Sequence, residues 1–107
     1  VLDSDDGARR LGEVALVPNS SPISQSGLLF YNTLFDENAA CHIALGQCYS
    51  KCFRGEKNLS KSEISKRGGN FSMIHIDWMI GSKDIDIDGV QSDRSRVAVF
   101  RKGEWAT

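Results

Sequence analysis

Residues Ser72 to Ile80 read SMIHIDWMI, and this stretch indicates the fold class most clearly. Branched and aromatic residues dominate it, as is typical of β-strands. Because side chains alternate along a strand, His75 and Asp77 are expected on one face, beside Met73 and Met79. The opposite face is wholly apolar and is expected to form core: Ile74, Ile76, Trp78 and Ile80.

Two further strands are expected upstream of this stretch. Leu11–Val17 (LGEVALV) is an apolar run interrupted only by Glu13, which is typical of a buried strand, and turn-forming residues 18–22 (PNSSP) follow it. Leu28–Phe35 (LLFYNTLF) is rich in aromatic and aliphatic residues and predicts a second strand or extended segment.

Downstream, the pattern again favours strands. Asp84–Val90 (DIDIDGV) alternates and is expected to turn at Asp88-Gly89. Val97–Phe100 predicts another strand, with a turn at Lys102-Gly103 after it.

Two short helices complete the prediction. Asn38 is a suitable N-cap for a helix over Ala39–Leu45 that ends at Gly46. Ser60 and Glu63 form a capping box for a second helix, which Gly68-Gly69 would end. Strands outnumber helices and the loops are too short and varied for regular βαβ units. We therefore expect an α+β domain with a mainly antiparallel or mixed sheet.

Composition excludes several function classes. The 107 residues fit one domain, and a net charge of −1 without a basic stripe argues against nucleic acid as a partner. No apolar run is long enough to cross a membrane. Three cysteines, an odd number, favour a reducing cytoplasm over a disulfide framework. The acidic start without methionine indicates a fragment of a larger protein.

Four polar side chains are candidates for chemistry. His75 and Asp77 share a strand face, and Glu13 is the one charged residue of its apolar run. With His42, these are the two histidines of the chain and two carboxylates in apolar surroundings, all ordinary zinc ligands. Structural alternatives remain open for each: a His–Asp hydrogen bond or an aspartate paired with an arginine elsewhere, a glutamate on an exposed edge, and a hydrogen-bonded His42.

Four segments resemble the thermophilic-type metallo-aminopeptidase family, in the order and close to the spacing of that family. They are GEVALV (12–17), FYNTLFDENA (30–39), CHIALG (41–46) and HIDWMIGS (75–82). The second and fourth are the most specific, and the resemblance extends from about Leu2 to Trp105.

The resemblance implies a two-metal exopeptidase that removes N-terminal residues from peptides. It makes Glu13, His42, His75 and Asp77 metal ligands and assigns Tyr49, with Glu13, to catalysis; Tyr49 would donate a hydrogen bond to the developing oxyanion. Two divalent ions, zinc, cobalt or manganese, would activate water and polarise the scissile carbonyl. It also implies a homodimer in the full-length enzyme.

The same resemblance implies that residues 1–107 are the C-terminal metal-binding, catalytic domain of a larger enzyme. The family uses a further metal-binding glutamate well upstream of Glu13, and only twelve residues precede Glu13 here. We therefore expect the missing N-terminal part to be a partner and the fragment alone to have little activity. Substrate side-chain preference is not readable from these residues.

Three other hypotheses compete with this one. Asp84, Asp86, Asp88 and Gly89 match the start of an EF-hand loop, but position twelve is Ser95 instead of glutamate. A structural zinc module could use Cys41, Cys48, Cys52 and His42, although the cysteine spacing is a poor match. A non-catalytic domain for dimerisation or interaction is the third hypothesis.

Overall fold

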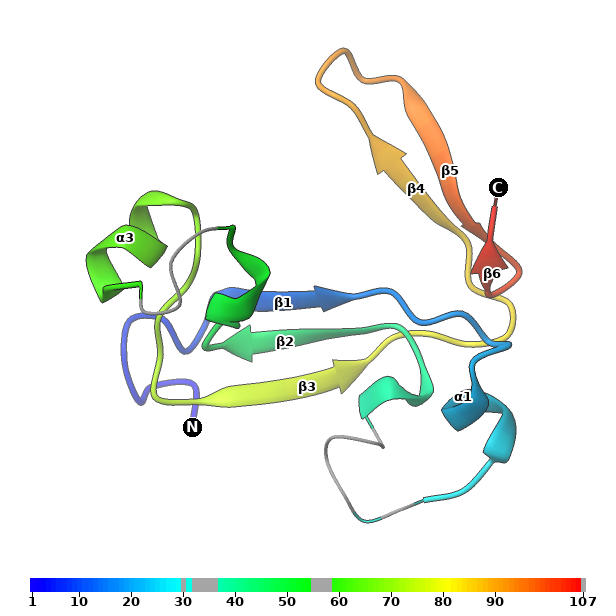
Figure 1. Ribbon diagram of the computed structural model, residues 1–107, viewed down its shortest axis with the longest axis horizontal. Coiled ribbons are helices and arrows are strands. Elements are labelled where there is room, and N and C mark those ends of the chain that lie inside the picture. Colours follow the sequence, from blue (N-terminus) through cyan, green and yellow to red (C-terminus); the bar gives the residue numbers. More distant parts are fainter. Residues whose placement is uncertain (30, 32–36, 55–58, 107) are drawn as a thin grey trace. The chain divides into compact units, whose positions relative to one another are not determined.

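The computed structural model describes residues 1–29, 31, 37–54 and 59–106. The chain forms two compact units, one built from residues 1–15 and 43–78 and the other from residues 16–42 and 79–107. Short helices accompany two three-stranded sheets, ordered β1-β2-β3 and β4-β5-β6 (Figure 1). The expected α+β class with antiparallel sheets is confirmed.

The first sheet places β2 (His42–Gly46) between β1 (Leu11–Ala15) and β3 (His75–Met79). The arrows of neighbouring strands run in opposite directions in Figure 1. The helix expected over Ala39–Leu45 is wrong, because residues 42–46 are the central strand and only a 3₁₀ turn, Glu37–Ala39, precedes it. Pairing on both sides of β2 outweighs the local helix signal, since intrinsic propensity is a weak prior.

Close backbone approach fixes the end of β2. Gly46 has φ +99°, and a Cβ there would lie 2.1 Å from the carbonyl oxygen of Ile74. The Asn70 side chain donates hydrogen bonds to the carbonyl oxygens of Gly7 (2.8 Å) and Gly46 (2.7 Å). These contacts join the N-terminal segment, the end of β2 and the segment before β3 in the first unit.

The helix α3 (Lys61–Lys66) begins where its capping box predicts. The Ser60 hydroxyl accepts a hydrogen bond from the backbone N–H of Glu63 at 3.3 Å, which satisfies one of the N–H groups that a helix start leaves without a partner. Ile64 is buried in the first unit, so the helix packs through that side chain. A second 3₁₀ turn, Ser50–Cys52, follows β2 and carries Tyr49 at its N-terminal boundary.

The second unit contains α1 (Pro22–Ser26), which starts with Ser21 as N-cap and ends at Gly27 in the left-handed region. The turn expected over residues 18–22 therefore leads into a helix that the sequence reading missed. The strand expected over Leu28–Phe35 falls mostly outside the described residues; Leu28 and Leu29 are exposed and not in a strand.

The second sheet is a hairpin of β4 (Ile87–Val90) and β5 (Arg96–Arg101), extended by β6 (Glu104–Trp105). The expected turn at Asp88-Gly89 is wrong, because both residues lie in β4 and pair with β5. The chain reverses around Arg94, which has φ +68°. The turn at Lys102-Gly103 is confirmed, and both residues have positive φ, as a two-residue hairpin turn requires.

Burial differs from the sequence expectation on the first sheet. The apolar face of β3 is not core, since Ile76 is 39% exposed and Trp78 is 63% exposed. Val14 of β1 is 66% exposed, so that strand is not buried either. Within the described residues, both are edge strands with one neighbour each, and burial is concentrated on the central strand β2. Among the described residues, none of the helices has the length and apolar character that a membrane crossing requires.

Candidate metal centre

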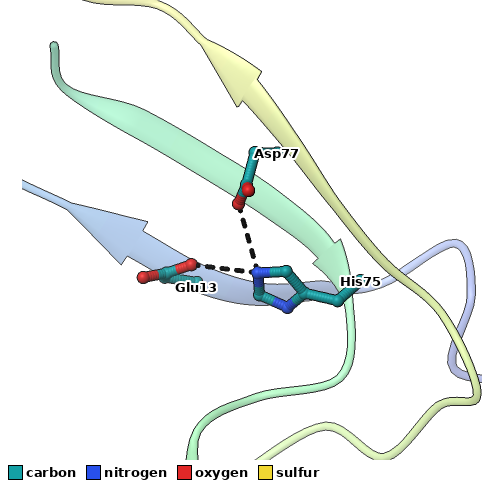
Figure 2. A group of neighbouring side chains, drawn as sticks. All are labelled: Glu13, His75 and Asp77. Atoms are coloured by element: carbon teal, nitrogen blue, oxygen red, sulfur yellow. Dashed lines mark hydrogen bonds and ion pairs between the residues drawn. The ribbon is translucent and has the colours of Figure 1, made fainter. Parts of the chain in front are cut away.

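Three of the predicted ligands come together on the first sheet. Glu13 comes from β1, whereas His75 and Asp77 come from β3 (Figure 2). Nε2 of His75 lies 3.2 Å from a carboxylate oxygen of Glu13 and 3.1 Å from one of Asp77. One potential ligand atom from each residue lies within 4.8 Å of the other two. All three side chains are half-buried, whereas Met73 and Met79, expected on the same face of β3, are 88% and 43% exposed.

The other ring nitrogen of His75 fixes the proton arrangement. Nδ1 lies 2.7 Å from the backbone carbonyl oxygen of Gln47. A carbonyl only accepts hydrogen bonds, so Nδ1 carries the hydrogen and the neutral ring presents a lone pair at Nε2. That lone pair faces the acceptor oxygens of Glu13 and Asp77. A cation among the three acceptors, either a proton on Nε2 or a metal ion, would stabilise this arrangement further.

The electrostatics of His75 agree with this requirement. Burial of the ring lowers its pKa, but the Gln47 carbonyl and the carboxylates of Asp77 and Glu13 raise it more, so the pKa of His75 is higher than the ordinary value. The surroundings therefore favour positive charge at this position.

The donor set fits a divalent metal ion. Imidazole nitrogen with two carboxylate oxygens suits zinc, cobalt or manganese. A ligating histidine usually donates its second N–H to a carbonyl or carboxylate, as His75 does to Gln47. Among the described residues, no cysteine lies close enough to join this group as a further ligand. The thiol of Cys41 instead lies against the backbone of Val17, with its sulfur 3.2 Å from the Val17 nitrogen.

Tyr49 lies beside the cluster. The centroids of the Tyr49 and His75 rings are 5.0 Å apart, with the ring planes inclined at 45°. The tyrosine is 44% exposed. A cavity of about 290 Å³ opens next to it and is lined by Glu13, Tyr49 and neighbours that include Leu11, Cys48, Cys52 and Phe53.

His42 belongs to the second compact unit, at the start of β2, and is 1% exposed. Its Nδ1 lies 3.0 Å from the carbonyl oxygen of Ala40. By the same argument as for His75, the neutral ring carries its hydrogen on Nδ1 and presents Nε2 as the potential ligand atom. The two histidines of the chain therefore share one arrangement.

The EF-hand hypothesis is not supported by the hairpin. Asp88 pairs with Arg101 at 2.5 Å and with Arg96 at 3.7 Å. Asp86 accepts a hydrogen bond of 2.9 Å from the backbone N–H of Lys102. The Asp88 ion pairs link β4 to β5, and the Asp86 hydrogen bond links the residue before β4 to the turn after β5.

The sheet and its convergent donors are those of a candidate metalloprotein, and comparison with known proteins specifies the class. The family model for thermophilic metalloproteases (M29) matches residues 1–105. The chain therefore belongs to the thermophilic metalloprotease family.

Named relatives agree with this membership. Aminopeptidase 2 of Geobacillus stearothermophilus is 60% identical over 106 residues, which are 99% of this chain and 26% of that protein. Aminopeptidase T of Thermus aquaticus is 56% identical over 98% of this chain and 25% of its own length. The structure of wild-type AmpT from Thermus thermophilus matches with a TM-score of 0.82 at 54% identity, covering 99% of this chain and 25% of that one. The chain spans about a quarter of the length of these relatives.

Proposed function

We propose that this chain is the metal-binding, catalytic part of a metal-dependent aminopeptidase that hydrolyses N-terminal residues from peptides. The convergence of Glu13, His75 and Asp77 around a single ring nitrogen carries the proposal. The names of the relatives, aminopeptidases at 51–60% identity, supply the reaction class.

Glu13, His75 and Asp77 would hold one divalent ion, and His42 is the fourth proposed ligand. When bound, divalent ions would polarise the scissile carbonyl and lower the pKa of an attacking water molecule. Zinc, cobalt and manganese all suit these donors, and a two-ion centre would need ligands in addition to the three-residue cluster. The 107 residues alone are therefore proposed to have little activity.

Tyr49 is proposed to act on the substrate directly. Its ring lies against His75 while nearly half of the residue remains accessible. A phenol hydroxyl can donate a hydrogen bond to the oxygen that gains charge as the peptide carbonyl is attacked. Glu13, which lines the same cavity as Tyr49, is proposed to serve catalysis as well as ligation.

The partners of the chain are proposed from its surface. Val14, Ile76 and Trp78 are exposed apolar side chains on the face of their strands opposite the cluster. Such a face favours contact with protein, which we propose is the N-terminal remainder of a longer enzyme that dimerises. Three free cysteines favour a reducing, cytoplasmic location. Neither nucleic acid nor membrane is proposed as a partner.

Hydrolysis of an aminoacyl anilide by the longer protein that contains this chain tests the proposal. We expect activity that a chelator removes and that added zinc, cobalt or manganese restores. Glu13→Gln and Asp77→Asn are each expected to reduce kcat/KM at least about 100-fold. Asp84→Asn, at an exposed position in the second unit, is the matched control. Full activity in the presence of chelator, or in both carboxylate variants, would refute the assignment.

A further inference from the structure

Gln47 contacts the segment around His75 through three different groups. Its backbone N–H donates to the carbonyl oxygen of Ile74 at 2.7 Å. Its side-chain oxygen accepts from the backbone N–H of Ser72 at 2.9 Å. Its own carbonyl oxygen accepts from Nδ1 of His75 at 2.7 Å. One residue therefore holds both the backbone of residues 72–75 and the imidazole ring.

The amide of the Gln47 side chain is itself fixed. Its nitrogen donates to the carbonyl oxygen of Cys48 at 3.0 Å, so donor and acceptor ends both have partners of the correct kind. The backbone N–H of Ser72 needs a hydrogen-bond acceptor, and the side-chain oxygen of Gln47 supplies it. Without that anchor, one of the two hydrogen bonds that tie Gln47 to the backbone of residues 72–74 would be lost.

The direction of the ring matters because histidine has two competing tautomers. Hydrogen on Nδ1 points the Nε2 lone pair at Glu13 and Asp77, which is the form that a metal ligand needs. Hydrogen on Nε2 would instead be stabilised by those same carboxylates, 3.2 Å and 3.1 Å away. The Gln47 carbonyl is the contact that opposes this second form.

We propose that Gln47 is a positioning residue that selects the Nδ1–H tautomer of His75 and so presents Nε2 for ligation. The inference rests on the proposed metal site for its functional consequence, but the tautomer itself is a property of the metal-free chain. Gln47 acts through His75 and does not touch substrate.

Nitrogen-15 NMR of the imidazole rings, at a pH well above the pKa of His75, tests the proposal in the 107-residue chain. The wild type should show the Nδ1–H pattern for His75, and an Nε2–H pattern there would overturn the proposal without any variant. Gln47→Met keeps the length of the side chain but removes the acceptor for the Ser72 N–H. The backbone carbonyl that faces His75 then loses this anchor, so His75 should shift toward Nε2–H. Gln47→Glu restores an acceptor and should return the wild-type pattern.

The control is Gln25→Met, because Gln25 also bonds to backbone through its side chain, at the Asn19 carbonyl in the second unit. It should leave His75 unchanged. Zinc affinity should fall by about 10- to 100-fold in Gln47→Met, as is usual when the group that orients a metal ligand is lost. An unchanged tautomer in Gln47→Met would refute the positioning role even if zinc binds. A changed tautomer in a chain that binds no zinc would support it and refute the metal site instead.

Discussion

Carboxylates are arranged in opposite ways in the two sheets. On the second sheet, Asp88 is surrounded by cations, with Arg101 at 2.5 Å and Arg96 at 3.7 Å. On the first sheet, Glu13 and Asp77 both face one imidazole nitrogen. The hairpin places arginine side chains beside its carboxylate, whereas the cluster places two carboxylates beside one imidazole nitrogen, where a proton or a metal ion would be stabilised. A carboxylate paired with arginine side chains stabilises the fold, whereas carboxylates grouped around one imidazole nitrogen indicate a candidate metal site.

The largest difference between the two regions is expected in zinc affinity. Glu13→Gln or Asp77→Asn removes one of the two carboxylate ligands and should weaken zinc binding by more than about 100-fold. Loss of a residue that only orients a ligand already lowers metal affinity by about 10- to 100-fold. Isothermal titration with zinc measures the effect. Asp88→Asn is the matched control and should bind as the wild type does; equal losses in all three variants would end the distinction between the regions.

A large loss of stability is expected from the backbone that supports the cluster. Gly46→Ala places a Cβ 2.1 Å from the Ile74 carbonyl oxygen at a position with φ +99°. Strain and overpacking together should lower the free energy of unfolding by about 3 kcal/mol. Gly27→Ala is also at positive φ, but no atom of the described residues lies within 4 Å of the added Cβ, so it should lose only about 1 kcal/mol. Urea denaturation compares the two, and a smaller loss at Gly46 than at Gly27 would contradict the close approach.

The smallest effect is expected at Asp88, and it depends on pH. The hydrogen bond and charge of Arg101 lower the pKa of Asp88 against the opposing effect of desolvation. The stabilisation is therefore present above the pKa of the unfolded chain, about 3.9, and disappears as the pH falls through the lower folded value.

Thermal unfolding of Asp88→Asn across this range provides the measurement. The variant should be slightly less stable than the wild type at neutral pH, and the two should converge in acid. The exposed Asp84→Asn should show no such convergence. A difference between Asp88→Asn and the wild type that grows as the pH falls would reverse the assigned sign.

Local chemistry explains which parts of the fold were predictable. The Ser60–Glu63 capping box and the Lys102-Gly103 turn depend on neighbours in sequence, and both are confirmed. The central strand β2 was mistaken for a helix because its strand partners are remote in sequence. Exposure of Ile76 and Trp78 likewise depends on what packs on β3, which an alternating pattern does not reveal.

The cluster was predictable only in part. Strand alternation is enough to place His75 and Asp77 on one face. Glu13 was a candidate because it is the one charged residue of an apolar run, but its grouping with His75 and Asp77 in one site came from the family resemblance. Gln47 was missed because its contribution is made by backbone groups and an amide, which leave no distinctive spacing in the sequence. Asn70 was missed for the same reason, since its side chain bonds to carbonyl oxygens of distant residues.

X-ray absorption at the zinc edge of the zinc-loaded chain tests the central claim most directly. The convergent imidazole and carboxylates predict nitrogen and oxygen neighbours at about 2.0–2.2 Å, with the outer-shell pattern of imidazole. Sulfur neighbours at about 2.3 Å would assign the metal to the cysteines, and a chain that retains no zinc would contradict a metal site at this cluster.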